Sequence, residues 1–403
     1  MRQLLSQYAR SLSLCGIVLA ALLGVYGFGH QYTFLNTQTD CRALARVIQL
    51  ALGGHSPYDR ALIEGSFESA PFTIDELFYP PSFIPVAAIF VGLGEVPLRM
   101  LVGALQVLCF IWIISRATRA VSAQDRGASY APLLYLCPVA FFALFQTARF
   151  GQISCCVCLA TLYFWDRWRA GRVGLWGIAA LCLASMKPSA VLALFVFLLL
   201  EGKVGIVLSV ALLHLLSAAL ASALTSVELS ALISGWVDAV AHYRELPQNA
   251  VTGSFVYGVS VLVQRMTGFV IMLDFAAIPL AFLVWRARRQ LSSHECIALL
   301  MVISFTIGSP HAYDFLFLLP ALFCVIERGY GVVVYWIVCA MLLIPQRALQ
   351  VVGVSSFDSI LRVLAPLVLL IFLLATRKLV KVAAADIKPL SRGGMEKTNP
   401  FGV

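Results

Sequence analysis

The sequence predicts an all-α protein, a polytopic helical bundle that is integral to a membrane. Three observations predict this fold class. Of the 403 residues, 61% are hydrophobic and 12% are charged, whereas a soluble domain has roughly 25% charged residues. The mean hydropathy is +0.90. Long apolar runs also follow one another along the chain. Such a chain fits lipid, where helices satisfy their backbone hydrogen bonds internally.

The apolar runs define the expected helices. A crossing needs about 20 apolar residues, and fewer where a helix is broken. We therefore expect about 11 to 13 transmembrane helices in one domain over residues 1–376, followed by a disordered basic tail over 377–403. The first run has no cleavage motif after it and is interpreted as a retained signal anchor. The runs are 12–29, 82–116, 129–147, 151–165, 174–187, 189–200, 204–224, 255–285, 295–308, 314–326, 330–345 and 359–376.

The distribution of charge predicts the orientation of the chain. The net charge of +9 lies in short clusters between the runs, for example around Arg116, Arg167 and Arg286. Such clusters are typical of cytoplasmic loops. We therefore expect a multi-pass protein of the cell (plasma or inner) membrane with both termini cytoplasmic. No basic face with interleaved aromatic residues lies outside the runs, which excludes nucleic acid as a partner.

Two segments need a separate account. The run 82–116 is too long for one straight helix, and Pro97, with Gly92 and Gly94 before it, predicts a sharp break with one short or interfacial half. A full hairpin here would reverse the orientation of everything downstream. In the first outer loop, residues 40–53 place apolar side chains on one helical face, which predicts an amphipathic helix at the membrane surface. That face consists of Leu44, Val47, Ile48 and Ala51.

The cysteines and motifs exclude several chemistries. Ten of the 11 cysteines lie within or at the edges of apolar runs, so we expect no disulfide framework. Cys155, Cys156 and Cys158 have no nearby His or acidic partner, which favours packing over a metal site. The chain contains no P-loop, Rossmann glycine pattern, HExxH motif or nucleophile elbow. We therefore expect no metal and no cofactor, and an activated donor must already reside in the membrane.

Polar residues at the expected outer ends of helices are candidates for chemistry. Asp40 can act as a general base or as an N-cap, and the residues alone favour the cap. Lys187, before the helix-breaking Pro188, can meet an anionic phosphate or extend to lipid headgroups, and its position within the run favours the phosphate.

Three further outer segments carry polar side chains. Arg149 and Gln152, at a tight turn, suit phosphate oxygens and lipid headgroups equally. His311, which follows Ser309-Pro310 in a break that also holds Tyr313 and Asp314, can donate to a phosphate, shuttle a proton or cap a helix. His242 and Asn249 line an acceptor site or are solvated residues of the outer loop 225–254.

Taken together, several motifs resemble glycosyltransferase family 87, a group of integral membrane enzymes of the GT-C class. Their order and spacing carry the resemblance, which covers roughly residues 12–325. The motifs are Asp40, Gly54-His55-Ser56-Pro57-Tyr58-Asp59, Tyr79-Pro80-Pro81, Gly151-Gln152-Ile153, Lys187-Pro188 and Ser309-Pro310-His311.

The resemblance implies a GT-C-like fold and a specific reaction. A sugar, mannose or another, would pass from a polyprenyl-phosphate donor to a lipid or glycan acceptor on the outer face, in one step with inversion. Asp40 would be the general base. Lys187, His311, Arg149 and Gln152 would hold the donor phosphate. The substrate-binding set would comprise Tyr58, Asp59, Tyr79, His242 and Asn249.

Two other functions stay open at this point. A transporter or lipid flippase would use the same broken helices, but it needs polar residues facing both sides of the membrane. The polar breaks cluster on one side, which favours the transferase. A structural subunit without chemistry is the third interpretation.

Overall fold

The computed structural model is all helical where it describes the chain, which confirms the predicted secondary-structure class. It describes residues 40–59, 78–92, 95–122, 136–245, 257–269, 273–308, 310–326, 331–343 and 356–375, with residues 15, 18, 19 and 22. No strand occurs in these ranges. The expected tail at 377–403 and most of the first run lie outside them.

The described helices alternate with short breaks along the whole chain. In chain order they are α3 (Asp40–Leu52), η1 (Pro81–Phe83), α5 (Ile84–Val91), α6 (Glu95–Ser122), α8 (Pro138–Phe150), α9 (Ser154–Arg169), α10 (Gly174–Ala184), α11 (Pro188–Leu200), α12 (Val204–Thr225), α13 (Leu229–Glu245), α14 (Val259–Thr267), η2 (Asp274–Ala276), α15 (Ala277–Ala287), α16 (Ser293–Ile307), η3 (Ala312–Leu318), α17 (Leu319–Ile326), α18 (Gly331–Leu343) and α20 (Ser356–Ala375).

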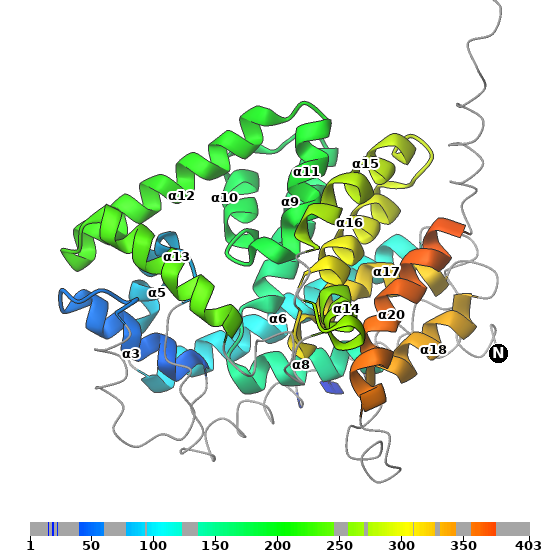
Figure 1. Ribbon diagram of the computed structural model, residues 1–403, viewed down its shortest axis with the longest axis horizontal. Coiled ribbons are helices and arrows are strands. Elements are labelled where there is room, and N and C mark those ends of the chain that lie inside the picture. Colours follow the sequence, from blue (N-terminus) through cyan, green and yellow to red (C-terminus); the bar gives the residue numbers. More distant parts are fainter. Residues whose placement is uncertain are drawn as a thin grey trace, which may run out of the picture.

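The helices form two groups around a central set. Figure 1 shows α3, α5, α12 and α13 on one side of the molecule and α16, α17, α18 and α20 on the other. Helices α9 and α11 lie between them, with α9 packed against α6 and α10 and α11 packed against α15 and α16. The site described below lies where this central set meets both groups.

Two of the described helices are long and apolar enough to cross a membrane, at Met100–Arg119 within α6 and at Val204–Thr225 (α12). Much of α12 is exposed, including the side chains of Leu208, Leu212 and Leu216. An exposed row of leucines fits a lipid surface. Eight other described apolar segments are shorter, at 10–17 residues. The number of crossings therefore stays a prediction.

The predicted helix breaks are present. Within the run 82–116, α5 ends at Val91 and α6 begins at Glu95. Pro97 lies in the first turn of α6, where its missing N–H breaks no helical hydrogen bond. The chain also leaves helical geometry between α10 and α11, at Lys187, and between α16 and η3, at Pro310.

Two predicted segments differ from the structure. The sequence predicts an outer loop at 225–254, but Leu229–Glu245 forms helix α13. The buried side chains of Leu232 and Ala239 lie two turns apart on one helical face, with the partly buried Trp236 between them. This spacing stabilises a helix although polar residues surround it. The run 255–285 is two helices, α14 and α15, with η2 before the second.

The amphipathic helix predicted at residues 40–53 is α3. Its apolar face is buried in the protein, because Val47, Ile48 and Ala51 are at most 1% exposed and the helix packs against α5, α6 and α12. The burial of the face therefore comes from neighbouring helices and does not require a membrane surface. Helix α3 thus leads the chain directly to Tyr58, at the site.

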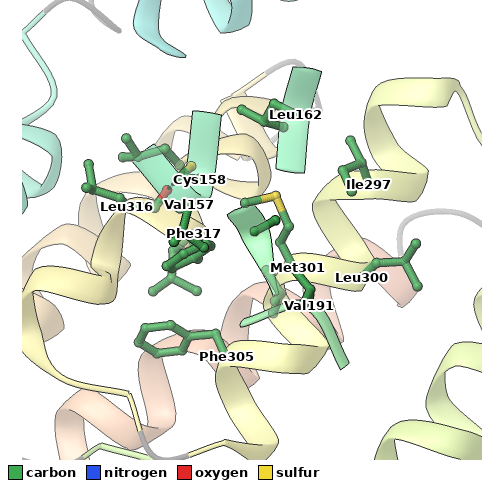
Figure 2. Close-up of a cluster of buried hydrophobic side chains, with 14 of the residues drawn as sticks. Val157, Cys158, Leu162, Val191, Ile297, Leu300, Met301, Phe305, Leu316 and Phe317 are labelled. Carbon is green, nitrogen blue, oxygen red and sulfur yellow. Dashed lines mark hydrogen bonds between the residues drawn. The ribbon is translucent and has the colours of Figure 1, made fainter. Parts of the chain in front are cut away.

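A tightly packed apolar cluster joins α9, α11, α16 and η3 (Figure 2). Val157 and Val191 each lie one turn from the beginning of α9 and α11, and both are fully buried. Met301 and Phe305 of α16 and Phe317 of η3 fill the space between them. Because protein cores tolerate few voids, this packing fixes the positions of the beginnings of α9, α11 and η3 relative to one another.

The basic clusters meet at the far ends of α9 and α11. Arg116 of α6 pairs with Asp166, near the end of α9, with Nε–Oδ2 and Nη2–Oδ1 distances of 2.6 and 2.5 Å. Arg288, after α15, pairs with Glu201, which follows α11. Both helices thus run from a polar beginning to an end that carries ion pairs. We call the region of these two pairs, Arg116 with Asp166 and Arg288 with Glu201, the ionic end.

A close backbone approach supplies a test of the fold. Tyr257 N–H donates to the Pro310 carbonyl at 2.8 Å, and a Cβ added to Gly258 would overlap the Gly308 carbonyl oxygen. We expect Gly258→Ala to lower the free energy of unfolding by about 1–3 kcal/mol, the usual cost of overpacking. Thermal unfolding in detergent measures the change.

The matched control is Gly205→Ala on α12, where nothing lies within 4 Å of an added Cβ. Its melting temperature should equal that of the wild type or rise slightly, since Ala is the better helix former. A Gly258→Ala variant that melts with the wild type would contradict the close approach.

Candidate active site

Three polar side chains from distant parts of the chain form a buried cluster. Its members are Lys187, Ser154 and Asp314, and we call it the Lys187 cluster. The Lys187 ammonium lies 2.9 Å from Asp314 Oδ1 and donates to Ser154 Oγ at 2.8 Å. The Ser154 hydroxyl donates to the same carboxylate oxygen at 2.7 Å. Ser154 is fully buried and Asp314 is 8% exposed. Lys187 therefore points inward, and its charge does not extend to lipid headgroups.

Each member of the cluster lies at the beginning of a helix. Ser154 is the first residue of α9, Lys187 is the N-cap of α11, and Asp314 lies in the first turn of η3. Pro188 sets the start of α11, since proline fits the first helical position and cannot continue α10. Helix beginnings carry partial positive charge and unpaired N–H groups. The cluster thus gathers positive potential as well as polar atoms.

Asp314 fixes the geometry of its neighbours. Its Oδ1 accepts from Lys187 and Ser154, and its Oδ2 accepts from the backbone N–H of His311 at 3.1 Å. The His311 and Tyr313 rings are stacked with centroids 5.1 Å apart, and Lys187 Nζ lies 4.6 Å from the Tyr313 ring centroid. Lysine has three N–H donors. Within the described part of the chain, oxygen atoms accept two of them, and the third has no oxygen acceptor there.

A second chain of hydrogen bonds, the tyrosine chain, adjoins this cluster. Tyr58 O–H donates to the Tyr79 carbonyl at 2.9 Å, and Tyr79 O–H donates to Gln152 Oε1 at 3.2 Å. Gln106 Nε2 donates to the Gln152 carbonyl at 2.8 Å. Burial raises the pKa of the Tyr58 phenol, so the group stays protonated and donates. Gln152 lies two residues before Ser154 and joins the two groups.

The local sequence positions Gln152. Gly151 ends α8 with φ of 70°, a left-handed conformation that glycine adopts without strain. The backbone N–H of Gln152 then donates to the Thr147 carbonyl at 3.1 Å. This tight turn directs the chain from α8 into α9 and aims the Gln152 side chain at Tyr79.

Helix α13 holds the Tyr58 and Tyr79 segments. Trp236 Nε1 donates to the Phe78 carbonyl at 3.1 Å. An added Cβ on Gly235 would lie 3.0 Å from Tyr58 Cβ, so α13 and Tyr58 are in close contact. His242 extends from the same helix and is partly buried. The segment expected to be an acceptor loop is thus a helix that packs beside the tyrosine chain.

The structure brings together Lys187, His311, Gln152, Tyr58 and Tyr79, which sequence analysis selected from five separate segments. Asp59 follows Tyr58 in the turn after α3.

Three selected residues cannot be placed in the site. Asp40 is the first residue of α3 and Arg149 lies in the last turn of α8, but their side chains are outside the described part. Asn249 is outside it altogether. Their roles stay predictions.

The residues that hold the cluster together were not among the predicted site residues. Asp314 was noted within the polar break at Pro310 but was not selected, although it lies three residues after His311, the spacing of a carboxylate that accepts from an N-cap N–H. Ser154 and Gln106 gave no signal, because a single hydroxyl or amide in an apolar run is common. In the described ranges, no three His, Cys, Asp or Glu side chains are grouped as a metal site requires. Cys155 and Cys158 are fully buried.

The fold and the site define a helical membrane protein with a polar cluster at the beginnings of its central helices. A model of glycosyltransferase family 87 matches residues 77–310, more than half of the chain. The chain therefore belongs to glycosyltransferase family 87, as its motifs suggested. The match includes Ser154 and Lys187 of the cluster and ends just before His311 and Asp314. No curated protein and no solved structure matches the chain.

The buried ion pair makes a prediction about stability. Asp314→Leu leaves the Lys187 ammonium buried without its counter-charge, so we expect a loss of about 3–5 kcal/mol in the free energy of unfolding. The double variant Lys187→Met/Asp314→Leu removes both charges and should lose less than Asp314→Leu alone. Thermal unfolding in detergent compares the two. Equal losses would show that the two charges are not coupled.

Proposed function

We propose that this glycosyltransferase moves a sugar, with mannose as the first candidate, from a polyprenyl-phosphate donor to a lipid or glycan acceptor on the outer face of the cell membrane. The observation that carries the proposal is the Lys187 cluster. The cluster places an ammonium group at the beginnings of helices, and the His311 segment is bonded to it through Asp314, all within an otherwise apolar protein. A phosphate attached to a lipid needs this combination of positive potential and apolar surroundings.

The donor phosphate would bind where Lys187 and His311 meet. The third Lys187 N–H and the imidazole donate to its oxygens, and the beginnings of α9 and α11 add N–H groups and favourable dipoles. Asp314 neutralises part of this charge, so the site holds the phosphate without trapping it. Gln152, and Arg149 at the end of α8, complete the set in this proposal.

The reaction would be a single displacement. The acceptor hydroxyl oxygen attacks the anomeric carbon on the face opposite the phosphate, its proton passes to Asp40, and the bond from carbon to phosphate oxygen breaks. Polyprenyl phosphate leaves with the electron pair, and the anomeric configuration inverts. Phosphate is a good leaving group. Positioning, base assistance and stabilisation of charge by Lys187 and His311 therefore suffice.

The tyrosine chain would bind the sugar or the acceptor. Tyr79 donates to Gln152, which lies two residues before Ser154 of the Lys187 cluster, and Tyr58 donates to Tyr79. Asp59 follows Tyr58 in the chain and would extend this set. Helix α13 would add His242, and Asn249 would follow it. Aromatic faces and hydroxyl groups together suit a sugar ring, which has apolar C–H faces and a polar rim.

The proposed orientation puts the Lys187 cluster at the outer face and the ionic end in the cytoplasm, with both chain termini cytoplasmic. Its support is the gathering of three basic clusters at the ionic end, around Arg116, Arg169 and Arg288. Helix α9 has 16 residues and so separates the two ends by about 24 Å. This distance is a large part of the roughly 30 Å hydrocarbon core of a bilayer.

The base assignment can be tested in proteoliposomes that contain polyprenyl-phosphate mannose and a membrane glycolipid extract as acceptor. We expect Asp40→Asn to lower the transfer rate by about 10²- to 10⁴-fold, because it removes the proton acceptor. The matched control is Asp274→Asn, which changes a carboxylate of η2 that is not among the proposed site residues and should retain full activity. Unchanged transfer by Asp40→Asn would reject Asp40 as the base. A wild-type protein that transfers no sugar from any polyprenyl-phosphate sugar would reject the proposed function.

The orientation can be tested by labelling exposed turns. His55, in the turn after α3, and Arg172, in the turn after α9, are both exposed. We expect a membrane-impermeant maleimide to label His55→Cys on intact cells and Arg172→Cys only after permeabilisation. Wild-type protein gives the background from the native cysteines. The reverse pattern, or labelling of both turns on the same side, would contradict the proposed orientation.

A further inference from the structure

A histidine outside the Lys187 cluster and the tyrosine chain bridges two serines. His214 Nδ1 lies 2.6 Å from Ser82 Oγ, and His214 Nε2 lies 2.7 Å from Ser185 Oγ. The imidazole comes from α12, Ser82 from η1 and Ser185 from the residues that follow α10. One side chain therefore joins three segments that are distant in the sequence. Both serines are buried, with 2% and 9% of their surface exposed.

The hydrogen bonds assign the imidazole tautomer. The Ser185 hydroxyl donates to the Cys182 carbonyl at 2.8 Å, so its oxygen must accept from His214 Nε2–H. The other ring nitrogen, Nδ1, then accepts from the Ser82 hydroxyl, which lies closer to it, at 2.6 Å, than to the alternative acceptor Met186 Sδ, at 3.9 Å. This assignment gives a directed chain, from Ser82 through a neutral imidazole to Ser185 and on to the carbonyl. Every donor in it has an acceptor, and no charge is buried.

Both ends of this chain lead to the site. Ser82 lies three residues after Tyr79, in the helical turn that ends the Tyr79 segment. Ser185 lies two residues before Lys187, in the break between α10 and α11. Ser217, one turn after His214 on α12, also donates to the Ser82 carbonyl at 2.8 Å. Helix α12 thus holds the Tyr79 segment at two points and the Lys187 segment at one.

The composition of α12 indicates that His214 is present for its hydrogen bonds and not for packing alone. Much of this helix is exposed leucine, at Leu208, Leu212, Leu216 and Leu220. A polar ring in such a helix is costly unless it is satisfied. Packing alone would be served by another leucine. The histidine instead forms hydrogen bonds with Ser82 and Ser185, two serines that lie outside the α-helices, and a leucine could form neither bond.

We propose that His214 is a positioning residue that sets the distance between the Tyr79 segment and Lys187, and hence between bound sugar and donor phosphate. The proposal rests on the proposed transferase function of the site. His214 touches no reacting atom. It acts through Ser82 and Ser185. Its loss removes the two directional bonds that hold the segments together and leaves the weaker contact of Ser82 Oγ with Met186 Sδ at 3.9 Å. Small displacements of reacting groups are sufficient to slow a reaction about 100-fold.

Two substitutions at His214 separate hydrogen bonding from volume. His214→Phe retains a ring and loses both hydrogen bonds, whereas His214→Gln keeps one donor and one acceptor. Transfer from polyprenyl-phosphate mannose is measured in proteoliposomes. The assay temperature is one at which thermal unfolding curves show that both variants are folded. We expect His214→Phe to lower kcat/KM by about 10- to 100-fold, with a lower kcat and a higher KM for the donor. His214→Gln should recover most of this loss.

The serines supply an independent test of the same chain. Ser82→Ala and Ser185→Ala should each lower kcat/KM in part, and neither should lower it further in the His214→Phe background, because the bond is already absent. The matched control is Ser209→Ala on α12. This exposed serine bonds only to the Gly205 carbonyl of its own helix, and its substitution should leave kcat and KM unchanged.

Three results would overturn the positioning role. The first is a His214→Phe variant that melts earlier but keeps wild-type kcat and KM, which would make the histidine a stability element only. The second is equal loss in His214→Phe and His214→Gln. The third is full additivity of the serine and histidine substitutions. A failure of the proposed function has a different signature, since the wild type itself would transfer no sugar in this assay.

Discussion

The buried contact of Lys187, Asp314 and Ser154 is the interaction on which the site depends. It joins the beginnings of three helices that lie 33 to 160 residues apart in the sequence. An unpaired charge in this apolar interior would be costly, so none of the three segments can move away alone. The tyrosine chain is attached to this contact through Gln152, and the His311 segment is attached through Asp314.

The contact depends in turn on apolar packing behind it. Val157, Val191 and Phe317 follow Ser154, Lys187 and Asp314 by only a few residues, and all three are almost fully buried. The directional polar bonds select one arrangement of the segments, and the close-packed cluster makes that arrangement rigid. A site held in this way loses little free energy to reorganisation when a ligand arrives, which is the general requirement for electrostatic stabilisation of a reaction.

Much of the fold class and half of the site could be predicted from sequence because the signals were local. Apolar runs, glycine and proline marked the helices and their breaks, including those at Gly92, Lys187 and Pro310. Polar residues at such breaks were visible as candidates without any knowledge of their neighbours. Helix α13 was missed because its apolar spacing is interrupted by polar residues and gives no continuous run.

The partners of the candidates could not be predicted, because they depend on contacts between distant segments. Ser154 and Gln106 are ordinary residues within apolar helices until the chain folds. His214 is similar, because a single histidine within α12 gives no indication of the two serines that it will meet. Asp314 was the one partner with a local signal, its spacing from His311. The burial of α3 against α5 was also beyond sequence, since an amphipathic face does not show what covers it.

The short segment at Phe78 and Tyr79 has no helix or strand of its own, yet side chains from elsewhere hold both of its carbonyl groups. Trp236 donates to the first and Tyr58 to the second. A ligand that approaches this segment therefore meets side chains rather than available main-chain oxygens. Side chains change by point substitution while the main-chain path persists. Recognition at this position can thus diversify between related chains independently of the scaffold that carries it.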